Sequence, residues 1–206
     1  MWSTRLKNSL SVGLLAVTAA VSSISSAADA GVRVRGTVVS RSGDQLDVKS
    51  REGSDVHITL KQGWVASGVA KAMLSDIKPG DYVGIASQPT AQGGDGALEV
   101  VIFPPALKGT AEGSFGWDLK PGSSMTNATV SNAVKSVNGS ALTVTYHGQE
   151  KKITVPNGTP VVSLTQATPN DVKAGAAIFV VAEKDASGSL SSTQLVVGKD
   201  GVVPPM

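Results

Sequence analysis

The sequence predicts an all-β protein formed by tandem duplication of a small five-stranded barrel of the OB or SH3-like kind. Short segments that alternate apolar and polar residues follow one another, with turn residues between them. The pattern of residues 34–102 returns between residues 130 and 197. Closing five short strands into a barrel removes exposed sheet edges, which favours this architecture over a pair of open sheets or one β-sandwich.

Residues 1–30 have the pattern of a secretory signal peptide. Arg5 and Lys7 precede an apolar run from Leu10 to Val21, and small residues follow it up to Ala28-Asp29-Ala30. We expect cleavage after Ala30, with Ser25-Ser26-Ala27 as a second site, and export to the periplasm. An apolar run of about twelve residues is too short for a comfortable membrane span, so we expect no stable span after cleavage.

The first repeat, residues 31–104, divides into five expected strands. The segments "GTVVS", "QLDVKS" and "VHITL" predict a three-strand meander, and "DYVGI" and "LEVVIF" predict two further strands. Pro79 and Gly80 fit a type II turn before the fourth strand, because proline fixes φ and glycine accepts a positive φ. The segment "VASGVAKAM", residues 65–73, could form a short helix that plugs the barrel, with Met73 in the core.

The second repeat, residues 126–200, overlays the first at a nearly constant spacing. Residues 58–102 match residues 153–197 without gaps, which pairs Asp76 with Asp171 and Gly80 with Gly175. We interpret both aspartates as acceptors of backbone N–H groups at a turn, with the following lysines in solvent. Residues 201–206 form a C-terminal tail.

Residues 105–125 form a Gly/Pro-rich linker between the repeats. Phe115 and Trp117 lie in it, and free linkers seldom hold aromatic residues. We therefore expect both side chains to pack in a cleft between the barrels and to form the contact surface for a ligand or partner.

The first repeat resembles an exported bacterial family known as domain of unknown function 5666. The resemblance lies in "GTVVSRSGDQLDVKS", "VHITL", "LSDIKPGDYVGIAS" and "DGALEVVIF", and the whole chain resembles a two-copy proteobacterial periplasmic subgroup. The second repeat departs from the pattern, since Asn132 and Ala176 stand where the first repeat has Gly36 and Asp81. The resemblance implies an OB-like barrel and an exported compartment, without catalytic residues or an established ligand.

Composition argues against nucleic acid as a partner and against catalysis. Without residues 1–30 the net charge is about +1, and apart from Trp2 the chain has seven aromatic residues, so a basic groove with stacking platforms is not expected. There is no cysteine. The histidines, His57 and His147, lie on a polar strand face and in a turn, and neither accompanies a nucleophile motif. We therefore predict that the protein is not an enzyme and holds no cofactor.

Metal binding has only weak candidates. Asp55 and His57 point to one strand face, but two ligands do not make a site. Met73, Met125 and Met206 could in principle favour copper(I). The sequence thus favours a non-enzymatic exported binding or interaction module that contacts an envelope protein or a small solute. The alternative is a periplasmic accessory protein for metal or solute handling.

Overall fold

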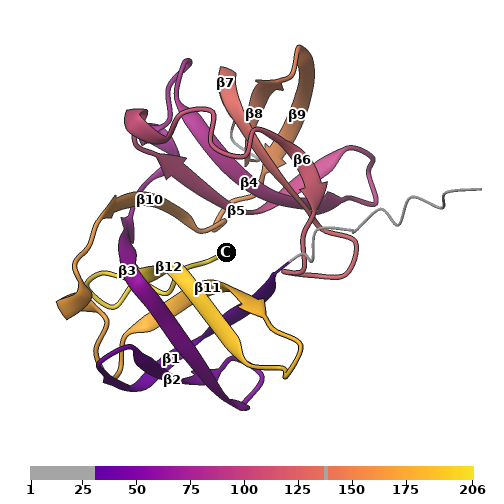
Figure 1. Cartoon of the computed structure of the whole chain (residues 1–206). Coiled ribbons are helices and arrows are strands. Elements are labelled where there is room, and N and C mark those ends of the chain that lie inside the picture. Colours follow the sequence, from indigo (N-terminus) through magenta and orange to yellow (C-terminus); the bar gives the residue numbers. More distant parts are fainter. Residues whose placement is uncertain (1–30, 137–138) are drawn as a thin grey trace, which may run out of the picture. The chain divides into compact units, whose positions relative to one another are not determined.

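The computed structural model describes residues 31–136 and 139–206, and its regular structure there is almost entirely β (Figure 1). The expected signal peptide lies outside the described residues. The strands are β1 (Val32–Ser42), β2 (Gln45–Ser50), β3 (Asp55–Lys71), β4 (Tyr82–Pro89), β5 (Asp95–Phe103), β6 (Gly113–Gly116), β7 (Ser124–Ser136), β8 (Gly139–Tyr146), β9 (Gln149–Val155), β10 (Val161–Gln166), β11 (Ala177–Lys184) and β12 (Leu190–Gly198). Three short 3₁₀ helices complete the set: η1 (Leu74–Asp76), η2 (Pro105–Leu107) and η3 (Pro169–Asp171).

The first barrel is closed by β1, β2, β3, β12 and β11 in that order. The strands β1, β2 and β3 form an antiparallel meander, and β3 then pairs in parallel with β12. An antiparallel ladder joins β12 to β11, and another joins β11 back to β1 through Val34 and Val180. A five-stranded barrel of this Greek-key kind is the OB-like architecture that the sequence predicts.

The second barrel repeats this order with β7, β8, β9, β5 and β4. The meander β7-β8-β9 is antiparallel, and β9 meets β5 in a short parallel pairing through Asp95 and Ile153. The pair β4-β5 is antiparallel, and β4 closes the ring against β7. The short strand β6 adds to the other side of the first residues of β7.

Each barrel therefore takes three strands from one repeat and two from the other. The pair β4-β5 from the first repeat completes the second barrel, and β11-β12 from the second repeat completes the first. The all-β class and the five-stranded barrel are confirmed. The strands pair differently from the expectation that residues 31–104 and 126–200 each close a barrel of their own.

The length of β3 gives the physical reason for this exchange. At about 3.3 Å per residue, its 17 residues extend over roughly 55 Å, whereas strands of small domains usually have 3–10 residues. The first half of β3 pairs with β2, and its last residues, Ser67–Lys71, pair with β10 instead. The chain thus leaves the first barrel before β4 begins. In the other direction β10 returns the chain from β9 toward η3.

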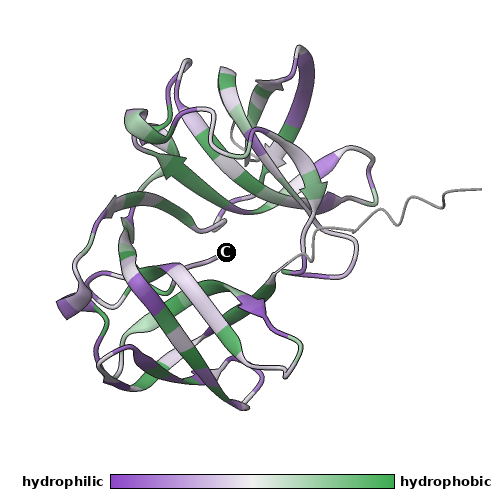
Figure 2. Cartoon of the chain, in the orientation of Figure 1, coloured by the Kyte–Doolittle hydropathy of each residue, from purple (hydrophilic) through white to green (hydrophobic). Residues whose placement is uncertain are grey.

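Two separate cores fill the barrels, and apolar residues run along the strands of both (Figure 2). Leu46, Ile58 and Val180 are fully buried in the first barrel, and Ile85, Leu142 and Ile153 are fully buried in the second. The exchange includes the residue that follows η1 and the residue that follows η3. Ile77 of the first repeat fills the second core, and Val172 of the second repeat fills the first.

Several local expectations can be compared directly with the structure. Gly80 and Gly175 have φ of 94° and 84°, as the predicted turns require. The alternative helix at 65–73 is wrong, because residues up to Lys71 continue β3. Met73 is 62% exposed and not in the core, since it lies where the chain crosses between barrels. The linker at 105–125 contains η2 and β6, because "GSFG" pairs with β7.

Candidate functional site

A third apolar cluster joins the two barrels, and we call it the junction. Its buried members come from both barrels, from β10 and from the C-terminal tail: Val69, Val101, Val162, Phe179 and Met206. Partly buried residues pack around them, including Trp117, Phe103 and Leu164. Strands from both repeats therefore meet at one apolar surface outside the barrel cores.

Trp117 occupies the junction, as the sequence analysis expects. It follows β6, and its backbone N–H donates to the Ser123 carbonyl at 2.9 Å. Its ring centre lies 6.1 Å from that of Phe179 on β11, and the Arg33 guanidinium lies 4.2 Å above the ring. A cation over an indole face is attracted by the ring quadrupole, so Arg33 and Phe179 hold Trp117 from two sides.

Phe115 lies at the outer rim of the junction. Its ring centre is 6.1 Å from that of Trp117 in an edge-to-face arrangement, and its side chain is 38% exposed. Phe115 faces Met125 across the β6-β7 pairing. The two linker aromatics thus lie together, with Trp117 partly buried and Phe115 open to solvent.

Arg35 is the buried cation of the junction. Its Nη2 and Nη1 donate to the two carboxylate oxygens of Asp118 at 2.7 and 3.2 Å, and its Nε donates to the main-chain oxygen of Met206. The hydrogen bond from Arg35 is the main reason that the pKa of Asp118 lies below its ordinary value, and the charge of Arg33 adds to it. Arg35 therefore connects β1 to the segment after β6 and to the tail.

Glu99 on β5 is a buried carboxyl group that the sequence analysis missed. It is fully buried, and neither carboxylate oxygen has a hydrogen-bond partner among the described residues; the same holds for Nε1 of Trp117. Burial raises the pKa of Glu99 to about 8, although the charges of Arg35 and Arg51 act in the opposite direction. One signal was present: a glutamate inside "LEVVIF", a strand that is apolar on both faces.

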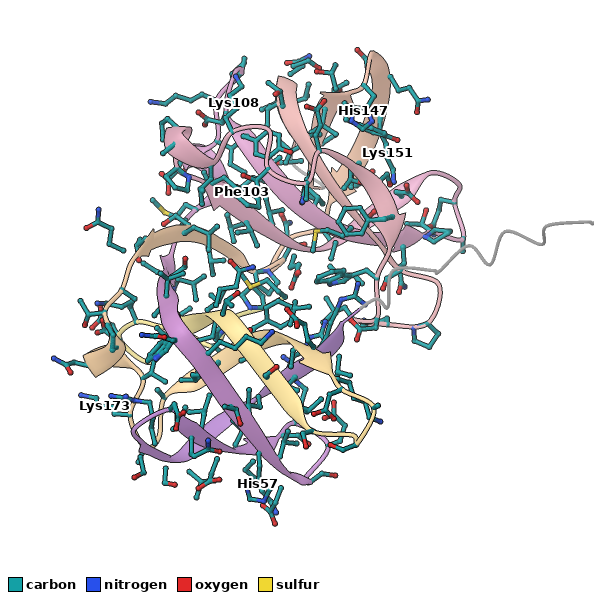
Figure 3. All side chains as sticks on the ribbon, viewed as in Figure 1. His57, Phe103, Lys108, His147, Lys151 and Lys173 are labelled. Atoms are coloured by element: carbon teal, nitrogen blue, oxygen red, sulfur yellow. The ribbon has the colours of Figure 1, made fainter. Side chains whose placement is uncertain are left out.

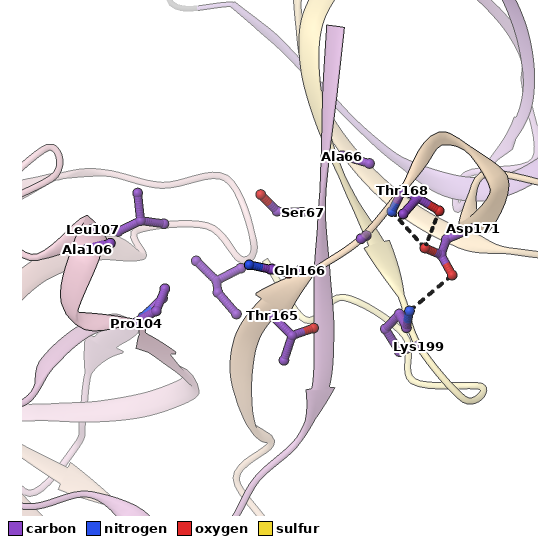
Figure 4. A pocket seen from close by; sticks show the side chains of 12 residues that line it. Ala66, Ser67, Pro104, Ala106, Leu107, Thr165, Gln166, Thr168, Asp171 and Lys199 are labelled. Carbon is purple, nitrogen blue, oxygen red and sulfur yellow. Dashed lines mark hydrogen bonds and ion pairs between the residues drawn. The ribbon is translucent and has the colours of Figure 1, made fainter.

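A pocket of about 610 Å³ lies elsewhere, between β10, β3 and η2 (Figure 4). Asp171 and Lys199 form an ion pair of 3.0 Å at one side of it. The Thr168 N–H, Lys199 and the Thr168 hydroxyl together lower the pKa of Asp171 to about 2. Leu107 and Leu164 form part of the apolar wall of this pocket. Phe115 and Trp117 do not line it.

Asp76 and Asp171 have the same local role at equivalent positions. The Asp76 carboxylate accepts the Met73 N–H at 2.8 Å, and the Asp171 carboxylate accepts the Thr168 N–H at 2.7 Å. Lys78 and Lys173 are exposed. The interpretation of these aspartates as turn acceptors is confirmed.

Asp55 and His57 each have a cross-strand partner on β2. Asp55 accepts from Lys49 at 2.9 Å, and Nδ1 of His57 lies 2.7 Å from a carboxylate oxygen of Asp47. His57 is at the outer end of the first barrel, and His147 is in a turn at the other barrel (Figure 3). Within residues 31–136 and 139–206 no three acidic, histidine or cysteine side chains gather as a metal site would require.

Comparisons with known proteins give no relative for this chain: no family model, no curated protein and no solved structure matches it. Among the described residues there is no helix with the length and apolarity needed to cross a membrane.

Proposed function

We propose that the protein is a non-enzymatic exported interaction module of the periplasm and that it contacts its partner at the junction rim. The single observation that carries this proposal is the exposed Phe115 packed against Trp117, whose ring also lies under the Arg33 guanidinium. Trp, Tyr and Arg dominate the energetics of protein interfaces, where they act as anchors within a polar rim. Asp118, whose side chain is 47% exposed, supplies such a polar neighbour.

Membership of the domain of unknown function 5666 family belongs to the same proposal. The support is the motif resemblance together with a barrel of the expected kind. A near-neutral charge supports a protein or a small solute as the partner in preference to nucleic acid, because phosphate contacts dominate affinity for nucleic acid. The cross-strand partners of Asp55 and His57 do not favour metal handling as a second function.

Site-specific photocrosslinking in intact cells tests the proposed surface. A photoreactive residue is placed at Phe115, and a matched one at Val39, an apolar residue of β1 that is 55% exposed. We expect one discrete crosslinked species from position 115 and none from position 39. Identical products at both positions, or no product at 115 in a protein that is exported and folded, would contradict the proposal.

The variant Phe115→Ser gives the quantitative version of this test. Because Phe115 is exposed, we expect the midpoint of thermal unfolding to stay within a few degrees of the wild type. The partner found by crosslinking should bind the variant at least about tenfold more weakly, which is the usual range for an aromatic anchor. Val39→Ser is the control, and we expect it to bind as the wild type does.

A further inference from the structure

The C-terminal tail lies inside the junction. Residues 202–206 follow a turn in which the Val202 N–H donates to the Lys199 carbonyl at 2.9 Å. The tail ends between strands of the two barrels (Figure 1), where Pro204 and Met206 are buried. Met206 belongs to the same apolar cluster as Val101 and Phe179.

A glycine allows the tail to turn back so closely. A Cβ atom on Gly198 would lie 1.6 Å from the Val202 carbonyl oxygen, which no side chain could tolerate. Any residue other than glycine at this position would therefore push the tail out of the junction. The close approach of Val202 to Gly198, the last residue of β12, thus determines the path of the tail.

The contacts of the tail resemble those of a bound peptide. Residues 203–206 belong to no strand, and Arg35 donates to the Met206 main-chain oxygen. Pro204 and Pro205 restrict φ and lack N–H groups, which suits an extended polyproline-like conformation with little entropy to lose. Proline-rich segments that dock against aromatic side chains are a recurring mode of peptide recognition, and Trp117 and Phe179 are the aromatic residues of this cluster.

The tail leaves one polar group of the junction unsatisfied. The indole N–H of Trp117 has no hydrogen-bond partner among the described residues, although Trp117 packs in the same apolar cluster as Met206. The Arg35 guanidinium lies 5.8 Å from the Trp117 ring centre. A main-chain carbonyl of a bound peptide is an acceptor of the kind that this N–H lacks.

We propose that residues 202–206 are an internal ligand of the junction and that an extended apolar peptide of a partner protein takes their place. This inference rests on the proposed function, since it specifies the chemistry of the partner at the same surface. The partner peptide carries an unbranched apolar residue where Met206 lies and a main-chain carbonyl that accepts from Arg35. Displacement of the tail then couples partner binding to release of residues 202–206.

The test compares the chain that ends at Gly201 with the full chain. The probe is a synthetic peptide with the sequence of residues 201–206, and its control carries aspartate in place of the methionine. We expect the probe to raise the midpoint of thermal unfolding of the truncated chain by a few degrees and to bind the full chain at least tenfold more weakly. The control peptide should do neither.

Two further variants keep the proposal falsifiable. Arg35→Met in the truncated chain should reduce affinity for the probe at least tenfold. If the truncated chain does not fold, the full-length variant Met206→Asp replaces it, because it disrupts the buried end of the tail and keeps the chain length. A folded truncated chain, or a folded Met206→Asp chain, that fails to bind the probe would overturn the inference.

The remaining outcomes separate this inference from the proposed function. Crosslinking from Phe115 without probe binding would leave the junction rim as a partner surface and reject the peptide. Probe binding without crosslinking would support peptide binding in the junction and reject the rim as a partner surface. A concentration-dependent dimer of the full chain, lost on truncation, would identify a second copy as the source of the peptide and overturn a separate partner.

Discussion

Arg35 on β1 and Asp118 after β6 form a two-pronged hydrogen-bonded ion pair with N···O distances of 2.7 and 3.2 Å. The guanidinium side chain is 8% exposed, whereas the carboxylate side chain is 47% exposed. The pair connects a strand of the first barrel to a segment that is anchored on the second through β6 and β7. Because Arg35 is buried and Asp118 is half exposed, we expect the loss of the arginine to lower the free energy of unfolding more than the loss of the aspartate.

The first prediction concerns this pair. Arg35→Met removes a buried cation with all its hydrogen bonds, so we expect the free energy of unfolding to fall by about 2–4 kcal/mol. Asp118→Asn should cost about 1 kcal/mol, since that carboxylate is half in solvent. Urea denaturation measures both. Arg33→Met is the control, because its contact with Asp118 is 3.7 Å, and a loss equal to that of Arg35→Met would contradict the assignment.

The second prediction concerns Glu99 and pH. The unfolded chain releases this proton near pH 4.5, whereas the folded chain keeps it until about pH 8. The free energy of unfolding therefore falls as pH rises between these values, by on the order of a few kcal/mol, and levels off above pH 8.

The variant Glu99→Gln isolates this effect, since it keeps the size of the side chain and removes its titration. We expect the free energy of unfolding of this variant, measured in a series of denaturation curves, to be nearly constant between pH 5 and 8, whereas that of the wild type falls. Asp171 does not interfere with this comparison. Its folded pKa of about 2 means that its contribution to stability is lost only in acid, below about pH 4. Parallel pH profiles for Glu99→Gln and the wild type would refute the prediction.

The third prediction follows from the exchanged strands. A protease site inserted in the loop 108–112, between η2 and β6, allows the folded chain to be cut into two pieces. Each piece holds strands of both barrels, so we expect the pieces to elute together on size exclusion and to separate only in denaturant. After separation, neither piece should unfold cooperatively. Two separated pieces with sharp unfolding transitions would indicate barrels closed within each repeat.

The fourth prediction concerns cooperativity. Leu46 and Leu142 are nearly fully buried at equivalent positions of the two cores. We expect Leu46→Ala and Leu142→Ala each to cost about 2–5 kcal/mol. Because each barrel is completed by strands of the other repeat, calorimetry should find one transition in each variant, shifted to lower temperature. A second transition that remains at the wild-type temperature would show that the barrels unfold separately.

Much of the local structure could be predicted. Alternating residues such as Val56, Ile58 and Leu60 define a half-buried strand, and Gly80 marks a turn that needs a positive φ. The linker aromatics were also identified, because Phe115 and Trp117 are unusual in a segment rich in glycine and proline. These features depend on near neighbours in the chain, where periodicity and backbone preference are strong.

Other features depend on distant segments. Residues 65–71 have Gly68 and small side chains, which leave helix and strand open, and pairing with β10 and β12 decides for strand. Glu99 was not selected because the burial of its carboxyl group depends on how β5 packs in the folded protein. Met73 resembles a core residue by type, but the chain crosses between barrels at its position, and it is exposed.

The sequence by itself determined the all-β class, the five strand segments of each barrel-forming repeat and their turns, and it singled out Phe115 and Trp117; β6, β10 and the second half of β3 were not predicted. Only the tertiary structure decided which pair of strands completes which barrel. The equivalent pairs β4-β5 and β11-β12 have similar apolar patterns, so either could close either meander. The long strand β3 carries the chain out of the first barrel, and that geometry selects the exchange and creates the junction where Arg35, Trp117 and Met206 meet.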